Sequence, residues 1–247
     1  MKLSVNLNKV ALLRNARGEN YPDLKYFANK AVDLGVDGLT LHPRPDHRHA
    51  TSNDVIELAK ISKDRGVEFN IEGNPFSKQN NEFVGFCELV KIINPDQITL
   101  VPDTIDQITS DHGWINGPHD EDLKKTIELL KDSSNNSKIS LFIDDLKGVE
   151  YAAEMDADLI EIHTGNFSKG IDNGDMSVIS EVKKIIDSAL QNNLLINAGH
   201  DLNLKNLHYL VEIGNINEVS IGHAIIIDSL NYGFEETILK YLEIIRN

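Results

Sequence analysis

The sequence predicts an α/β fold, a (β/α)8 TIM barrel that forms one domain over residues 1–247. The length of 247 residues suits one barrel of this kind. Short β-rich runs alternate with longer amphipathic stretches, and the unit of one run and one stretch recurs eight times, about every 30 residues. An open, doubly wound sheet also alternates in this way, but eight repeats fit a closed barrel better.

The predicted strands are short runs rich in β-branched and aliphatic residues. In chain order they are residues 3–7, 38–41, 67–71, 97–101, 139–143, 159–162, 194–197 and 218–221. The predicted helices between and after them are residues 23–34, 53–65, 80–93, 120–132, 147–155, 175–192, 203–212 and 231–246. Two stretches have no clear period, 12–22 after the first strand and 102–119 after the fourth. The second is long for such a connection, which favours an active-site lid over a passive surface loop.

Composition excludes several classes of protein. The formal net charge of −15 argues against a general binder of nucleic acid or anionic membranes, which needs a broad positive surface. No apolar run reaches the roughly 20 residues that span a bilayer, and residues 1–7 are too polar for a secretory signal. The single cysteine, Cys87, provides neither a disulfide nor a thiolate metal cage. We therefore expect a cytoplasmic protein without a bound metal.

Polar residues gather where predicted strands end, which is where the catalytic groups of a barrel lie. They are Asn6, Asn8, His42, Glu72, His163, His200, Gly222 and His223. One histidine at a strand end is more often structural than catalytic, but four of the nine histidines end strands here. Their convergence on one face predicts proton-transfer chemistry, because histidine titrates near neutral pH.

Arginines are concentrated after the first two strands. Four of the six lie there, namely Arg14, Arg17, Arg44 and Arg48. A guanidinium binds phosphate or carboxylate in a bidentate manner, so the cluster favours a pocket for an anionic substrate. The competing interpretation is that these arginines pair with some of the 39 acidic side chains of the protein.

Two carboxylates and two glycine motifs complete the predicted site. Glu72 would become a base near neutral pH if it were shielded from water, while Glu161 is expected inside the barrel, where it could orient a histidine. Asn197-Ala198-Gly199-His200 and Ser220-Ile221-Gly222-His223 follow strands seven and eight. Barrels often bind phosphate there, and a helix starting near Ala224 would add its dipole.

Taken together, these segments resemble the pyridoxine 5′-phosphate synthase family from residue 3 to about residue 240. The resemblance rests on an ordered set of motifs, each of them weak alone. They are Val5-Asn6-Leu7-Asn8, Leu13-Arg14-Asn15-Ala16-Arg17-Gly18, Thr40-Leu41-His42-Pro43-Arg44-Pro45-Asp46, Arg48-His49, Asn70-Ile71-Glu72, Leu100-Val101-Pro102-Asp103, Ser140-Leu141-Phe142-Ile143-Asp144, Ile160-Glu161-Ile162-His163-Thr164-Gly165, Asn197-Ala198-Gly199-His200 and Ile221-Gly222-His223-Ala224-Ile225-Ile226.

The resemblance implies a transferase-class, ring-closing synthase. The family condenses 3-amino-2-oxopropyl phosphate with 1-deoxy-D-xylulose 5-phosphate and uses no metal or organic cofactor. It implies that His42 and Glu72 accept protons and that His200 donates one. The substrate-binding residues it implies are Asn6, Asn8, Lys9, Arg17, Arg44, His49, Thr109, Glu161, Asp201, Gly222 and His223. It also implies small phosphorylated substrates, a lid over 102–119 and a homo-oligomer, an octamer.

This sequence departs from the family at three of these positions. Many members have Asp-His where this chain has Asn8-Lys9, and glycine where Asp201 stands. Either Thr109 or Ser110 could align with the lid residue that contacts substrate. Three alternatives stay open: a sugar-phosphate isomerase or aldolase, a metal-dependent barrel hydrolase, and a binding barrel without catalysis. No predicted strand ends in lysine, and no His-x-His follows the first strand, which argues against a Schiff-base aldolase and a metallohydrolase respectively.

Overall fold

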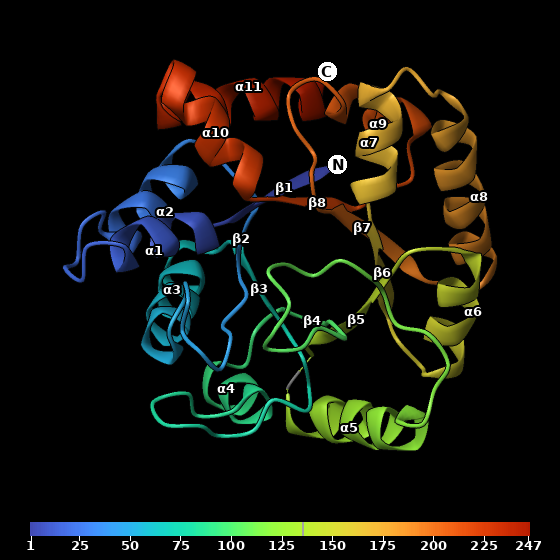
Figure 1. The fold of residues 1–247 in the computed structure, drawn as a ribbon, viewed down its shortest axis with the longest axis horizontal. Helices are drawn as coiled ribbons and strands as arrows, with labels where there is room; N and C mark the ends of the chain where they lie inside the picture. The colour runs from blue at the N-terminus through green and yellow to red at the C-terminus, as the bar shows by residue number, and fades with distance from the viewer. Residues whose placement is uncertain (135) are drawn as a thin grey trace.

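A computed structural model describes residues 1–134 and 136–247. Its centre is a closed barrel of eight parallel strands in sequence order, so the predicted TIM barrel is confirmed (Figure 1). All eight predicted strands are present, with ends within two residues of the expected positions. They are β1 (Lys2–Asn6), β2 (Gly38–Leu41), β3 (Glu68–Gly73), β4 (Gln97–Leu100), β5 (Lys138–Ile143), β6 (Leu159–His163), β7 (Leu195–Gly199) and β8 (Glu218–Ile221).

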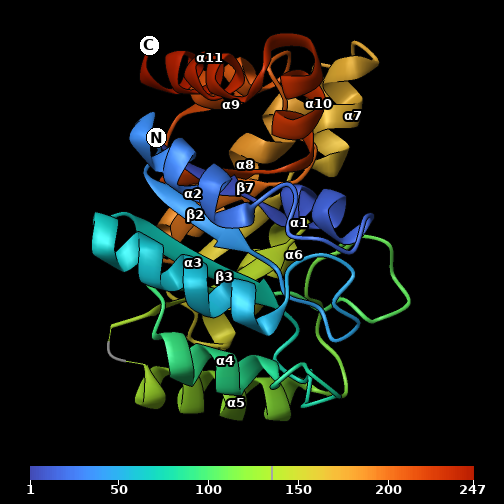
Figure 2. The same cartoon turned by 90° about the vertical axis from the view of Figure 1, so that its left-hand side faces the viewer.

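Helices surround the barrel (Figures 1 and 2). They are α1 (Asn8–Asn15), α2 (Leu24–Asp33), α3 (Ser52–Arg65), α4 (Phe86–Ile93), α5 (Asp120–Ser133), α6 (Leu146–Glu154), α7 (Gly165–Asp172), α8 (Ser177–Gln191), α9 (Leu207–Ile213), α10 (His223–Tyr232) and α11 (Phe234–Arg246). Of these, α2, α3, α4, α5, α6, α8, α9 and α11 follow one another around the barrel in chain order. The expected helix near Ala224 is α10. Helix α3 shows how local sequence sets a boundary: Thr51 forms a capping box with Asp54, and Gly66 ends the helix at φ +68°.

Three helix predictions were wrong or incomplete. The stretch 12–22 was expected to be irregular, but residues 12–15 belong to α1, which buries only Val10 and Ala11 and so lacks an amphipathic period. Helix α7 was not predicted, since its two glycines disfavour a helix; Gly170 is required because a Cβ there would lie 2.4 Å from Val178. Helix α4 begins at Phe86 rather than residue 80, after Gly85 at φ +96°.

The hydrophobic core lies between the strands and the helices. Outward-facing strand residues are buried and apolar, for example Val5, Leu39 and Ile71. Side chains on the inward face are buried but polar: Ser4, Thr40, Asn70, Thr99, Ser140, Glu161, Asn197 and Ser220. Several of them bond one another: the hydroxyl oxygens of Ser4 and Thr40, on neighbouring strands, lie 2.7 Å apart, and Thr99 Oγ1 lies 3.0 Å from Asn70 Oδ1. The barrel interior therefore carries the polar groups that lead up to its mouth.

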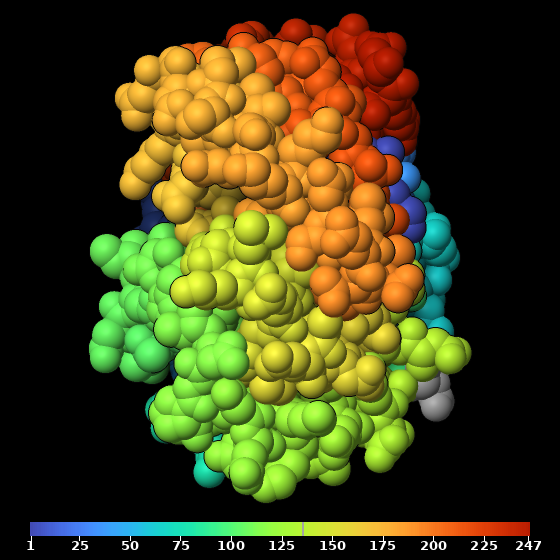
Figure 3. Space-filling view, turned by 90° about the vertical axis from the view of Figure 1, so that its right-hand side faces the viewer, coloured from blue at the N-terminus to red at the C-terminus, as the bar shows by residue number. Residues whose placement is uncertain are grey.

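The segment between β4 and α5 projects at the carboxyl end of the strands, green in Figures 2 and 3, and lies over the centre of the barrel in Figure 1. It is irregular, as the sequence predicted for 102–119. Its far end is anchored at Trp114, whose amide donates to Phe142 O (2.9 Å) and whose indole donates to Leu100 O (2.8 Å). Among the described residues, no helix is long and apolar enough to cross a membrane.

Candidate active site at the mouth of the barrel

The mouth of the barrel brings together the polar residues expected from the strand ends. Asn6 ends β1, Glu72 lies within β3, His163 ends β6, and His42 and His200 directly follow β2 and β7. The two-residue period of a strand turns Asn70 and Glu72 inward, and both are buried. Residues far apart in the sequence therefore share one site because the strands close into a barrel.

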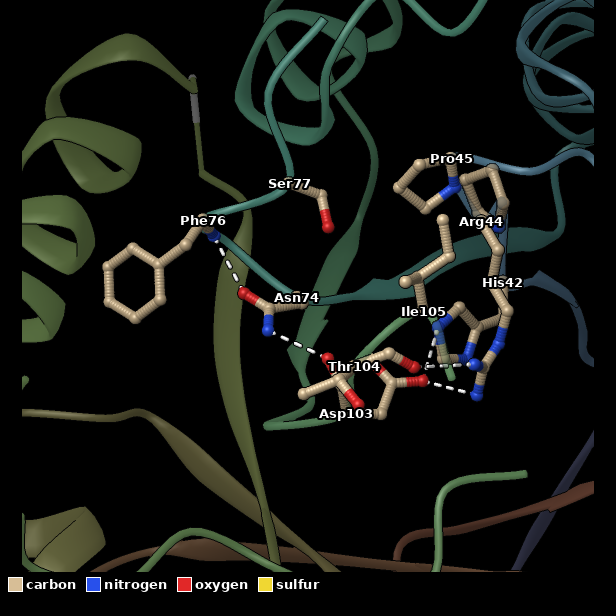
Figure 4. Close-up of a pocket in the computed structure, with 10 residues that line it drawn as sticks. His42, Arg44, Pro45, Asn74, Phe76, Ser77, Asp103, Thr104 and Ile105 are labelled. Carbon is tan, nitrogen blue, oxygen red and sulfur yellow. Dashed lines mark hydrogen bonds and ion pairs between the residues drawn. The ribbon is translucent and has the colours of Figure 1, made fainter. Parts of the chain in front are cut away.

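His42 lies between the carboxylates of Glu72 and Asp103, and Figure 4 shows the contact with Asp103. Its Nδ1 is 3.7 Å from Glu72 Oε2, and its Nε2 is 3.3 Å from Asp103 Oδ2. Its amide donates to Asn8 Oδ1 (3.0 Å), so the first residue of α1 fixes the backbone of His42. Burial lowers the pKa of His42 to about 3, and the Arg44 cation adds to this. The imidazole is therefore neutral at physiological pH and can accept a proton.

Glu72 is held at the centre of the mouth. Asn6 Nδ2 donates to its Oε2 and Ser220 Oγ to its Oε1, each at 3.4 Å. Burial raises the pKa of Glu72 to about 7, while Ser220 opposes the shift and the Asp103 charge reinforces it. A carboxyl group that titrates near neutral pH can both take and return a proton during turnover.

Asp103 organises the neighbouring part of the site. It forms an ion pair with Arg44, and Ser110 Oγ on the segment between β4 and α5 donates to its Oδ2 at 3.3 Å. Arg44 Nη1 also donates to two carbonyls of the same segment, those of Thr104 (3.2 Å) and Gln107 (3.0 Å). A cavity of about 200 Å³ opens beside these groups, between the β2, β3 and β4 loops (Figure 4). Its lining combines a buried cation with a neutral histidine, which suits an anionic, hydroxylated ligand.

His200 lies in an unusual backbone conformation. Its φ is +83° and that of Asp201 is +57°, a region that non-glycine residues rarely occupy. The positive φ of Asp201 suits glycine at this position, and aspartate also tolerates it, so aspartate can replace glycine there. His200 Nε2 lies 3.1 Å from Thr109 Oγ1, and its Nδ1 lies 3.1 Å from Asp201 Oδ2. Thr109 therefore reaches His200, whereas Ser110 reaches Asp103.

Glu161 is buried inside the barrel, as the sequence predicted, and lies against Gly199. Thr99 Oγ1 donates to its Oε2 at 3.5 Å. Burial raises the pKa of Glu161 well above its ordinary value, and the nearby Glu72 charge adds to this. The carboxyl group therefore keeps its proton to a higher pH than an exposed glutamate does. Gly199 makes room for it, because a Cβ at that position would lie 2.3 Å from Glu161 Oε1.

Glycine and a helix start lie together at the end of β8, where the sequence predicted a phosphate site. At Gly222 a Cβ would lie 2.9 Å from the carbonyl oxygen of Asn6, so only glycine fits there. Helix α10 begins directly afterwards, at His223, and no side chain caps its first turn. Free amides at a helix N-terminus together with the helix dipole favour an anion.

The remaining predicted residues are placed less uniformly. Lys9 lies in the first turn of α1, and His49 is buried, 6.2 Å from His42 between ring centroids, with its pKa lowered to about 3 by burial and by His42. Arg17 is exposed on the turn after α1, and within the described chain no bond joins its side chain to the mouth. Arg14 pairs with Asp54 at 2.6 Å. For Arg14 the competing interpretation of a structural ion pair is therefore correct.

Two carboxylates at the mouth received no role from the sequence. Asp103 and Asp144 follow β4 and β5, and both contact site histidines. The rule that polar residues at strand ends line the site would have found them. In the part of the chain that the structure describes, no group of three or more His, Cys, Asp or Glu side chains could hold a metal ion.

A closed parallel barrel whose mouth carries neutral histidines, high-pKa carboxyl groups and an uncapped helix N-terminus defines an enzyme of the (β/α)8 class. The family model described as "Pyridoxal phosphate biosynthesis protein PdxJ" matches residues 3–247. The chain belongs to this family.

Two curated relatives named pyridoxine 5′-phosphate synthase match the chain over nearly its whole length. The protein of Christiangramia forsetii is 41% identical over 99% of both chains, and that of Cytophaga hutchinsonii is 43% identical over 98% of this chain and 97% of its own. Among solved structures, a thiamine phosphate pyrophosphorylase from Pyrococcus furiosus has a TM-score of 0.63 at 12% identity and covers 99% of this chain and 95% of its own. The last likeness concerns the fold alone.

Proposed function

We propose that this protein is a pyridoxine 5′-phosphate synthase that condenses 3-amino-2-oxopropyl phosphate with 1-deoxy-D-xylulose 5-phosphate. The products are pyridoxine 5′-phosphate, inorganic phosphate and water. One observation carries the proposal: His42, Glu72 and His200, the residues that match the family's acids and bases, surround one barrel mouth, with His42 and Glu72 3.7 Å apart. The family model matches residues 3–247, a range that includes all three of these residues.

The protonation states suit the assigned roles. His42, with its pKa lowered to about 3, is a neutral acceptor throughout the physiological range. Glu72, with a pKa of about 7, accepts a proton in one step and can return it in the next. His200 would donate to a leaving hydroxyl group or phosphate, and the contact of its Nε2 with Thr109 fixes the ring. The raised pKa of Glu161 favours its protonated form, which would donate a hydrogen bond to charge that develops on the intermediate.

Two anion sites would hold the two substrates. The Gly222–His223 turn would bind the phosphate of the aminoketone, which is retained in the product. Asn6 and Arg17 would contact the same substrate. Arg44, His49 and Thr109 would bind the deoxyxylulose phosphate beside the cavity at His42, with Asn8, Lys9 and Asp201 supplying further polar contacts. Arg44 now donates to lid carbonyls, so binding of this substrate would exchange those bonds for bonds to phosphate.

We further propose a cytoplasmic homo-oligomer, an octamer as the family resemblance implies, with no cofactor. Large apolar side chains are exposed on neighbouring helices, including Leu13 (51% exposed) and Leu230 (81%), which supports burial against further copies. Native mass spectrometry tests the octamer, and a monomer at micromolar concentration would contradict it. Cell fractionation tests the location.

A coupled phosphate-release assay tests the function. Phosphate release should require both substrates and should fall at least a hundredfold in Glu72→Gln and in His200→Asn. Asp172→Asn, an exposed change at the end of α7, serves as the matched control and should leave the rate unchanged. Release from either substrate alone, or equal rates in all variants, would contradict the proposal.

A further inference from the structure

A second histidine lies against the proposed proton donor. The rings of His163 and His200 meet edge to face, with centroids 4.6 Å apart and an interplanar angle of 82°. On its other side His163 lies against Phe142, at 5.2 Å between centroids. Only 10% of the His163 side chain is exposed. The position of the His163 ring therefore sets the position of the His200 ring.

Asp144 fixes His163 in turn. Its Oδ1 lies 2.6 Å from His163 Nδ1, and its Oδ2 accepts the amide of Gly113 at 2.6 Å. Burial opposes ionisation, but the bonds from His163 and Gly113 lower the pKa of Asp144, so it is a carboxylate. An ionised Asp144 can only accept, so His163 carries its proton on Nδ1. Gly113 belongs to the far end of the lid, so one carboxylate contacts both the lid and the histidine pair.

The residue after His163 supports the backbone of His200. The Thr164 amide donates to Gly199 O at 2.8 Å, and Thr164 Oγ1 donates to Gly199 O at 2.7 Å and to His200 O at 2.5 Å. These bonds hold the turn in which His200 has its positive φ. The end of β6 thus contacts His200 in two ways. The His163 ring packs against the His200 ring, and Thr164 bonds the backbone carbonyl of His200.

We propose that Asp144 and His163 are positioning residues for His200, and that the Asp144 carboxylate links the base of the lid to the proton donor. The assignment of His200 as donor rests on the proposed function. A carboxylate behind an imidazole fixes the tautomer and the orientation of that ring. The Asp144–His163 pair therefore holds the ring against which His200 packs, and the negative charge of Asp144 attracts a proton on His200.

Other charged and titratable groups also face this histidine pair. Asp201 contacts His200 Nδ1, Glu161 lies beneath Gly199, and the Glu72 and His200 charges interact. His112 lies close enough to Asp144, and His223 to Asp201, to influence those carboxyl groups. The Asp144 variant leaves all of these groups in place, so a change in pH dependence can be attributed to this single charge.

The test compares Asp144→Asn with the wild type and with the Asp172→Asn control. The loss of one nearby negative charge should move the alkaline limb of the kcat profile toward acid by about half to one pH unit. We expect kcat to fall about tenfold and KM to stay within about twofold. His163→Asn, which keeps a donor for Asp144, should retain more activity than His163→Phe, which keeps only the ring shape.

An NMR titration of ¹⁵N-histidine-labelled protein gives a readout that needs no turnover. The His200 signal is assigned by its loss in His200→Asn, and its titration midpoint should move toward acid in Asp144→Asn. Unchanged midpoints and pH profiles in folded Asp144→Asn would overturn the inference and leave only a structural bond. If the wild type shows no turnover but Asp144→Asn still shifts the His200 midpoint, the proposed function is refuted and the coupling between Asp144 and His200 is retained.

Discussion

Glu72→Gln separates the proposed catalytic role of this residue from a structural role. The side chain is buried beneath Asn6 and Ser220, and burial raises its pKa from an ordinary 4.5 to about 7. Ionising it in the folded protein therefore costs about 3 kcal/mol more than in water. Glutamine keeps the shape of the side chain and removes this cost along with the proton.

The sign of the stability effect follows from linkage. A carboxyl group with a raised pKa stabilises the folded state fully below its ordinary pKa, and this stabilisation is lost as pH rises through about 7. Between pH 5 and pH 8 the wild type should thus lose about 2 to 3 kcal/mol of folding free energy that the variant retains. The variant should be the more stable protein at pH 8 and the far less active one.

Urea denaturation at pH 5 and pH 8, followed by circular dichroism, measures this difference. The reasoning predicts that the stability gap between Glu72→Gln and wild type widens in favour of the variant as pH rises. The phosphate-release assay on the same samples should show a rate at least a hundredfold lower. A gap that is independent of pH would refute a buried, high-pKa carboxyl group at this position.

Three further changes test other parts of the structure. Thr109→Val removes the 3.1 Å contact with His200 Nε2 and should lower kcat about tenfold in steady-state kinetics, whereas an unchanged kcat would deny Thr109 this role. Gly113→Ala places a Cβ 2.5 Å from Ile143 Cα and should cost about 1–3 kcal/mol in urea denaturation, and an unchanged midpoint would contradict the close approach. Burial raises the pKa of Glu218 to about 8, so its stabilising contribution is lost between pH 4.5 and about 8. The Tm of Glu218→Gln should therefore exceed that of the wild type clearly at pH 9 and little at pH 5, and parallel Tm curves would contradict this.

The barrel could be predicted from the sequence because its strands are local signals. Each is a short buried run, and their eightfold repetition leaves few topologies. Helix α7 could not be predicted, since Gly165 and Gly170 disfavour a helix and are required by contacts with His163 and Val178, residues that only the fold brings near. Helix α1 was also not predicted, because it buries too small a face to show an amphipathic period.

The candidate site was predictable at strand ends and less so in loops. His42, Glu72 and His200 were placed correctly because a strand end fixes where a side chain lies. Asp103 and Asp144 follow strands and could have been placed at the mouth by the same rule, but their histidine partners become visible only in the fold. The sequence likewise did not identify the partners of the clustered arginines, and only the fold shows that Arg14 forms an ion pair with Asp54.

The identity of the product tests the central claim most directly. Wild-type protein is incubated with 3-amino-2-oxopropyl phosphate and 1-deoxy-D-xylulose 5-phosphate, and the mixture is analysed by mass spectrometry alongside a phosphate assay. The account predicts pyridoxine 5′-phosphate and inorganic phosphate in equal amounts, formed only when both substrates are present. Folded protein that forms no pyridoxine 5′-phosphate, or that releases phosphate without it, would contradict the account.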